Sequence, residues 1–86
     1  MLNVPVLIDK IIAEIPDDYD KKQKVIRELD YVRRSAPYRA PECLYLSTED
    51  IHMVLQNYIL KYFDKDKYPD WIHNVLAIYW EGVSLL

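Results

Sequence analysis

The chain has 86 residues, of which 51% are hydrophobic and 29% are charged, and its formal net charge is −3 at pH 7. These totals predict one globular domain over residues 1–86, exclude a disordered chain, and disfavour non-specific nucleic-acid binding, which needs an excess of basic side chains. The single glycine favours helices over turn-rich sheets. The N-terminus lacks the basic start of a signal peptide, so none is expected. No apolar run approaches the roughly 18 residues of a membrane span.

The first predicted helix begins near Asn3, whose side chain can accept from the free N–H groups of the first turn. Its apolar residues recur three and four positions apart, at Val4, Leu7, Ile8, Ile11, Ile12 and Ile15. Pro5 is tolerated in the first turn, and Pro16 ends the helix because the residue before a proline avoids the α region. The pattern therefore predicts a helix with one wide apolar face.

The second predicted helix is capped by Asp17 or Asp18 and ends at Pro37. Its apolar stripe is narrower and comprises Tyr19, Val25, Ile26, Leu29, Val32 and Ala36. Acidic residues gather at its start and basic residues further along, as the helix dipole favours. Asp20 with Lys24 and Asp30 with Arg34 have the spacing of helical ion pairs.

A basic face on this second helix is the alternative functional site. Lys24, Arg27, Tyr31 and Arg34 follow one another at three- and four-residue steps, and Arg39 could extend the row. Basic residues interleaved with tyrosine can bind phosphates and stack bases, so this face predicts a small helical nucleic-acid-binding domain. The competing interpretation is a solvated surface whose arginines pair with nearby acidic residues. It is favoured because these acidic neighbours cancel most of the local positive field.

The connection over residues 37–47, PYRAPECLYLS, is predicted to be extended because two prolines restrict it. Its length exceeds that of an ordinary helix–helix connection, which is typical of functional loops. We expect Tyr38, Arg39 and Tyr45 to contribute to an interface. Cys43 is the single cysteine, so no internal disulfide can form, and a reducing, cytoplasmic setting is expected.

The third predicted helix covers Ser47 to Phe63. Ser47 is the expected N-cap, with Asp50 reaching back in a capping box. The apolar face comprises Ile51, Val54, Leu55, Tyr58, Ile59, Tyr62 and Phe63. Because this stripe is long enough to touch both neighbouring helices, the third helix is predicted to organise the fold.

The segment 64–70, DKDKYPD, places Asp64, Asp66 and Asp70 at the first, third and seventh positions of a calcium loop. Such a loop also needs glycine at its sixth position, where this chain has Pro69. The match therefore fails, and we predict no metal site here and no cofactor.

A Cys–His pair is the one nucleophile–base combination that the sequence offers. Cys43 with His52 or His73 would have to supply it, and nothing around Cys43 marks an activated thiol. The three residues also lack the spacing of a zinc site. We therefore expect a protein that is not an enzyme.

The fourth predicted helix runs from Pro69 to about Glu81, with Gly82 expected to end it in a left-handed conformation. Its main apolar face comprises Ile72, Val75, Leu76, Tyr79 and Val83. Trp71, Ile78 and Trp80 lie off that face. A helix that is apolar nearly all round is either buried on several sides or partly an interface.

The eight tyrosines, two tryptophans and one phenylalanine exceed what the core of a small domain is expected to hold. Tyrosine, tryptophan and arginine dominate protein–protein hot spots. The predicted interface comprises Tyr38, Arg39, Tyr45, Trp71, Ile78 and Trp80. The sequence thus predicts two helical hairpins joined by the 37–47 connection, in a protein-binding module that occupies a partner's surface as an inhibitor, antitoxin, immunity or phage-type accessory protein. A homodimer stays open.

Overall fold

A computed structural model describes residues 2–86, and within that range the chain forms four α-helices and no β-strand. The α-helices are α1 (Val4–Glu14), α2 (Lys22–Ser35), α3 (Leu44–Tyr58) and α4 (Asp70–Val83). Short 3₁₀ helices occupy the connections: η1 (Ala36–Tyr38), η2 (Pro41–Cys43), η3 (Leu60–Tyr62) and η4 (Lys65–Lys67). The predicted all-α, four-helix class is confirmed.

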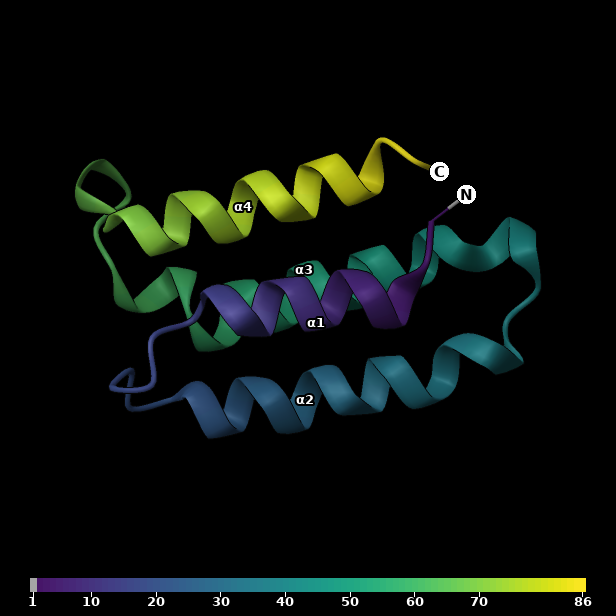
Figure 1. Cartoon of the computed structure of the whole chain (residues 1–86), viewed down its shortest axis with the longest axis horizontal. Helices are drawn as coiled ribbons and strands as arrows, with labels where there is room; N and C mark the ends of the chain where they lie inside the picture. The colour runs from purple at the N-terminus through teal and green to yellow at the C-terminus, as the bar shows by residue number, and fades with distance from the viewer. Residues whose placement is uncertain (1) are drawn as a thin grey trace.

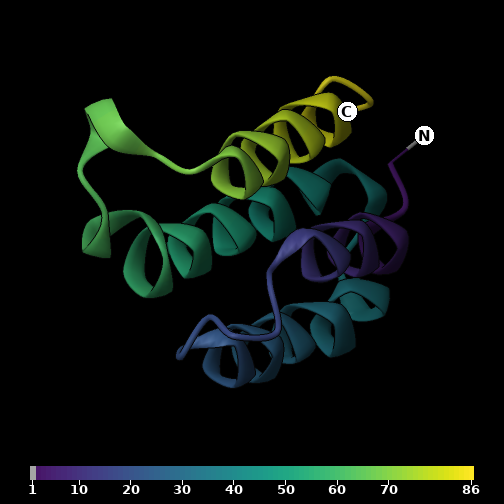
Figure 2. The same cartoon turned by 60° about the vertical axis from the view of Figure 1, so that its left-hand side comes forward.

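Consecutive helices run in opposite directions, so α1 and α3 run the same way (Figure 1). Turned by 60°, the molecule shows α1 and α3 in the middle, with α4 on one side and α2 on the other (Figure 2). The most extensive contacts join α1 to α4 and α2 to α3. The helices of each predicted hairpin are antiparallel, but α3 and α4 make few direct contacts, and the closest packing is between helices of different hairpins.

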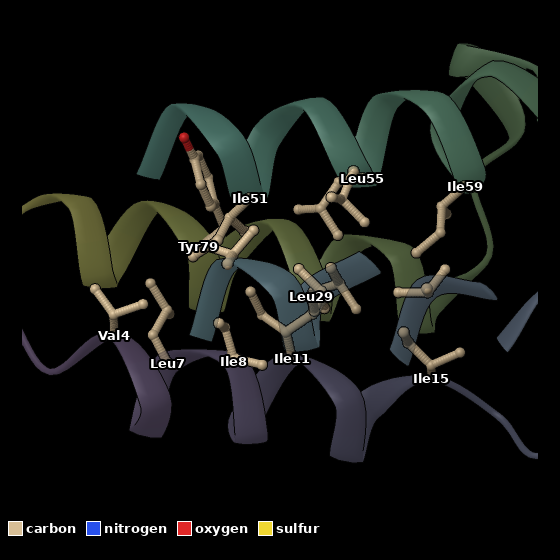
Figure 3. Packing of buried hydrophobic residues seen from close by; sticks show 14 of the residues in the cluster. Val4, Leu7, Ile8, Ile11, Ile15, Leu29, Ile51, Leu55, Ile59 and Tyr79 are labelled. Carbon is tan, nitrogen blue, oxygen red and sulfur yellow. The ribbon is translucent and has the colours of Figure 1, made fainter. Parts of the chain in front are cut away.

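The core lies between α1 and α3, and α2 and α4 complete it. Figure 3 shows the apolar side chains of α1 and α3 pointing toward each other, with Leu29 of α2 and Tyr79 of α4 between them. Ile8, Ile11 and Ile51 are fully buried. Because α1 packs against all three other helices, it shares the organising role that the sequence predicts for the third helix.

The ends of α1 match the sequence prediction. The Asn3 Oδ1 atom accepts a hydrogen bond from the Val6 N–H at 3.1 Å, so Asn3 caps the helix as expected. The helix ends at Glu14, before Pro16. The Lys22 ammonium donates to the Ile15 carbonyl at 2.6 Å, which satisfies a carbonyl group beyond the last turn.

The start of α2 differs from the prediction. Neither Asp17 nor Asp18 caps it: the helix begins at Lys22, and its N-cap residue Lys21 makes no side-chain capping bond. The chain from Pro16 forms turns first, and the Asp17 carboxylate instead pairs with the Lys22 ammonium at 2.8 Å. This ion pair lowers the pKa of Asp17 through a hydrogen bond and charge.

The start of α3 also differs from the prediction. The helix begins at Leu44, so Ser47 is not its N-cap but a fully buried residue within it. Asp50 accepts from the Arg39 guanidinium at 2.8 Å instead of closing a capping box. The predicted extended connection is correspondingly short: the backbone is extended at Arg39 and Ala40, between η1 and η2.

The end of α3 falls at Tyr58, five residues before the predicted Phe63. The backbone leaves the helical region at Ile59, where φ is −130°, and continues into η3. This break rotates the following side chains, so that Tyr62, predicted to lie in the apolar face, is half exposed. Phe63 stays partly buried against the core.

Gly82 does not end α4 in a left-handed conformation, because no glycine in residues 2–86 has a positive φ. It lies inside the helix and is buried. A Cβ atom at this position would lie 2.7 Å from Leu7 Cδ1. The glycine therefore leaves room for the Leu7 side chain where α4 passes close to α1, and its conformational freedom is not used.

Candidate protein-binding surface

Four large side chains are exposed on α3 and on the two helices that flank it. Tyr45 and Met53 of α3 are 49% and 55% exposed, Trp80 of α4 is 58% exposed, and Tyr31 of α2 is 60% exposed. We call these four residues the α3 surface. Exposed apolar and aromatic side chains that gather on adjacent helices are typical of an interaction site.

A shallow groove of about 330 Å³ separates α3 from α4 within this surface. Glu49, His52, Met53, Tyr79 and Trp80 line it. Its side-chain positions on α3 are three and four residues apart, so one helical face supplies them.

Tyr79 forms the floor of this groove and is only 5% exposed. Its hydroxyl donates to the Thr48 carbonyl at 3.0 Å, which ties α4 to α3. The rings of His52 and Trp80 pack against the Tyr79 ring at centroid distances of 5.7 and 5.1 Å. Burial, and secondly the charge of Glu49, raises the pKa of Tyr79. The Trp80 ring therefore packs against a tyrosine whose position is held by a hydrogen bond to α3.

A second groove, of about 490 Å³, lies between α2 and α3. Its lining comprises Glu28, Tyr31, Val32, Ser35, Asp50, Met53, Val54, Asn57 and Tyr58. Met53 lines both grooves and stands between them. Methionine adapts its shape to a bound partner more readily than branched side chains do, which suits this shared position.

The residues predicted as an interface do not all lie together. Tyr45 and Trp80 belong to the α3 surface. Tyr38 is 91% exposed in η1, before the extended residues of the connection. Arg39 is partly buried, because its guanidinium bonds to Asp50 at 2.8 Å and to the Ser47 hydroxyl at 3.4 Å.

Trp71 and Ile78, also predicted for the interface, are half-buried elsewhere. The Trp71 ring packs against Tyr19 at 5.2 Å and Phe63 at 5.8 Å between ring centroids. Ile78 faces α1 and lines a small groove of about 150 Å³ with Leu7 and Gly82. Both therefore contribute to packing between elements.

The sequence prediction omits Met53, together with the three other residues that line the groove with Trp80, namely Glu49, His52 and Tyr79. Met53 lies off the apolar stripe of its helix, as Trp80 does on α4. In the sequence, Met53 and Trp80 can both be identified as apolar side chains that lie outside the main apolar stripe of their helix. The sequence predicts Tyr31 in the basic face of α2, and in the structure this residue also borders the groove with α3.

The basic face of α2 is exposed as predicted. Lys24, Arg27, Tyr31 and Arg34 all reach solvent. Arg34 stacks on the Tyr31 ring at 4.8 Å and pairs with Asp30 at 3.2 Å, as its spacing indicates. Asp30 also lies beside Lys24 and Arg27, which reduces the positive field of this face.

Tyr19 packs against Phe63 and Trp71, and its ionisation should make the free energy of unfolding depend on pH. Its hydroxyl donates to the Tyr58 carbonyl, and burial, with smaller contributions from Asp20 and Tyr62, raises its pKa from 10.0 to about 12. Because the folded chain holds this proton more tightly than the unfolded chain, Tyr19 should contribute fully below about pH 10 and lose its contribution between pH 10 and 12.

The measurement is urea denaturation of the wild type and Tyr19→Phe across this pH range. The stability advantage of the wild type over Tyr19→Phe should shrink as the pH rises from 10 toward 12. An advantage that stays constant across the range would contradict the assigned role. Comparison with the variant removes the contribution of Tyr79, whose pKa is also raised and which is present in both proteins.

Within residues 2–86, no group of three or more His, Cys, Asp or Glu side chains gathers closely enough to hold a metal ion. In the same range, each helix falls short of the length and apolar content that crossing a membrane requires. No family model, curated protein or solved structure matches the chain.

Proposed function

We propose that the chain is a non-enzymatic protein-binding module that acts by occupying a surface on a partner protein. The α3 surface is the part that binds. The supporting observation is the exposure of Trp80 and Met53 around a groove whose floor, Tyr79, is fixed by a hydrogen bond to α3. Tryptophan and tyrosine anchors of this kind dominate binding energy in protein complexes.

The size of the chain is compatible with blocking a partner. An ordinary interface buries about 800 Å² on each side, roughly one seventh of the 5528 Å² that this molecule exposes. An inhibitor, antitoxin, immunity or phage-type accessory protein would act in this way, without chemistry of its own. The proposal includes the cytoplasm as the compartment, because a single cysteine fits a reducing environment.

Trp80→Ala should abolish most of the binding without unfolding the chain. Loss of a central aromatic anchor costs about 2 kcal/mol or more, which raises the Kd at least roughly 30-fold. The partner would be captured with the wild type from an extract of the source cells, purified, and titrated calorimetrically against both proteins. Circular dichroism melting checks that the variant remains folded.

Tyr62→Ala is the matched control, because Tyr62 is an aromatic residue of similar exposure outside the α3 surface. It should bind as the wild type does. If Trp80→Ala binds as tightly as the wild type, the α3 surface is not the binding site.

Nucleic-acid binding is the second candidate, favoured by the exposure of Lys24 and Arg27 on α2. Within residues 2–86, neither side chain forms an ion pair that would neutralise it. A single-stranded oligonucleotide bound by this face would dissociate steeply with added salt and would be lost in Lys24→Ala and Arg27→Ala. Binding by the α3 surface would depend little on salt by comparison.

A further inference from the structure

The charge on α3 and α4 has a single sign. Their charged residues, with histidine counted as neutral, are Glu49, Asp50, Asp70 and Glu81, and neither helix contains a lysine or arginine. The lysines and arginines nearest in the chain lie on α2 and in the connections. A partner that binds across α3 therefore meets carboxylates without competing cations from these two helices.

Each groove of the α3 surface holds a carboxylate beside its exposed apolar residues. Glu49 lies beside Met53 and Trp80 in the groove with α4. Glu28 lies beside Tyr31 and Met53 in the groove with α2. Among residues 2–86, neither glutamate forms an ion pair, whereas Asp50 is already paired with Arg39.

Resting on the proposed function, we infer that the α3 surface recognises a basic amphipathic segment of its partner. Lysine or arginine side chains of that segment pair with Glu49 and Glu28, and its aliphatic side chains cover Met53. The Trp80 ring can contact the cationic as well as the aliphatic side chains of that segment, since an aromatic face binds apolar groups and cations alike. Complementary charge of this kind selects the partner and its orientation.

A second copy of this chain fits the same surface poorly. A symmetric dimer uses the same patch on both subunits, so Glu49 of each copy would approach acidic helices that hold no cation. On α2, Arg34 stacks on Tyr31 and is already paired with Asp30 at 3.2 Å, while Lys24 and Arg27 lie beside the same aspartate. The charges therefore favour a different, basic partner.

Fluorescence anisotropy with three labelled 18-residue peptides tests the inference. The first peptide carries leucine and lysine in an amphipathic helical pattern, the second has the same composition in a scrambled order, and the third replaces lysine with glutamate. The first should bind at least roughly tenfold more tightly than the other two, because it alone combines an apolar face with positive charge.

Two substitutions in the chain locate the bound peptide. Glu49→Gln keeps the size of the side chain and removes its charge, and should weaken binding of the first peptide by roughly threefold to tenfold. Trp80→Ala should weaken it at least as much. Glu42→Gln, at an exposed carboxylate in η2, is the matched control and should leave the affinity unchanged.

Three results would overturn the inference. The first is that the scrambled or the acidic peptide binds as tightly as the first peptide. The second is that Glu49→Gln and Trp80→Ala leave binding of the first peptide unchanged. The third is that light scattering shows a dimer of the chain that Trp80→Ala dissociates. If the peptides fail while the captured partner still depends on Trp80, the inference falls and the proposed function stands. If the captured partner is also indifferent to Trp80, both fall.

Discussion

Ile11→Ala should lower the free energy of unfolding by roughly 2–5 kcal/mol, because it removes a fully buried aliphatic side chain and leaves a cavity. Ile11 lies on the face of α1 that meets the rest of the core (Figure 3). A domain of this length has a total stability of only about 4–13 kcal/mol, so the loss is a large part of it. Urea denaturation monitored by circular dichroism would measure the change.

Ile12→Ala is the matched control for this prediction. It makes the same chemical change one position along the helix, where the side chain is only partly buried. The loss there should be clearly smaller, because less apolar area leaves the core and solvent can fill the space. Equal losses at the two positions would show that the packing of α1 differs from the one described.

The first helix could be predicted almost completely from the sequence. The cap at Asn3 and the stop at Pro16 are local signals, and the apolar stripe is wide and regular. Each of these depends on neighbours in the chain rather than on tertiary contacts. The same is true of the all-α class, which the periodic spacing and the scarcity of glycine determine.

The start of α3 could not be predicted, because tertiary contacts override the local capping signals there. Ser47 has the chemistry of an N-cap, yet it is fully buried and within reach of the Arg39 guanidinium. Asp50 is held by the same guanidinium, from a residue eleven positions earlier. No local pattern reveals such a partner, so the capping box looked complete.

The candidate site was predictable only in part. Trp71 and Trp80 both lie off the main apolar stripe of their helix, and the sequence treats them alike. Tyr19 and Phe63, which are distant in the chain, enclose Trp71, whereas Trp80 has no such cover and is 58% exposed. Whether an off-stripe aromatic residue is an anchor or part of the packing depends on these distant neighbours.

Gly82→Val should lower the free energy of unfolding by roughly 1–3 kcal/mol, because it forces extra atoms between α4 and α1. A Cβ atom at this position already lies 2.7 Å from Leu7 Cδ1 and 3.2 Å from Leu7 Cγ. Rotation of the Leu7 side chain can relieve the first contact more readily than the second. Valine adds two further methyl groups, so the helices must separate.

Gly82→Ala separates this steric cost from the effect of replacing glycine in a helix. Alanine gains roughly 1 kcal/mol of helix propensity over glycine, which offsets the shift of the Leu7 methyl groups. The net change should stay within about 1 kcal/mol of the wild type. A large loss already in Gly82→Ala would mean that Leu7 cannot move.

The double variant Leu7→Ala/Gly82→Val tests whether these two residues carry the contact between α1 and α4. Leu7→Ala alone should cost roughly 2–5 kcal/mol, since Leu7 is buried. In combination, the valine side chain fills part of the space that Leu7 vacates, so the double loss should be smaller than the sum of the single losses. Additivity within about 0.5 kcal/mol would contradict direct contact between them, because only residues that touch or share a cavity couple more strongly.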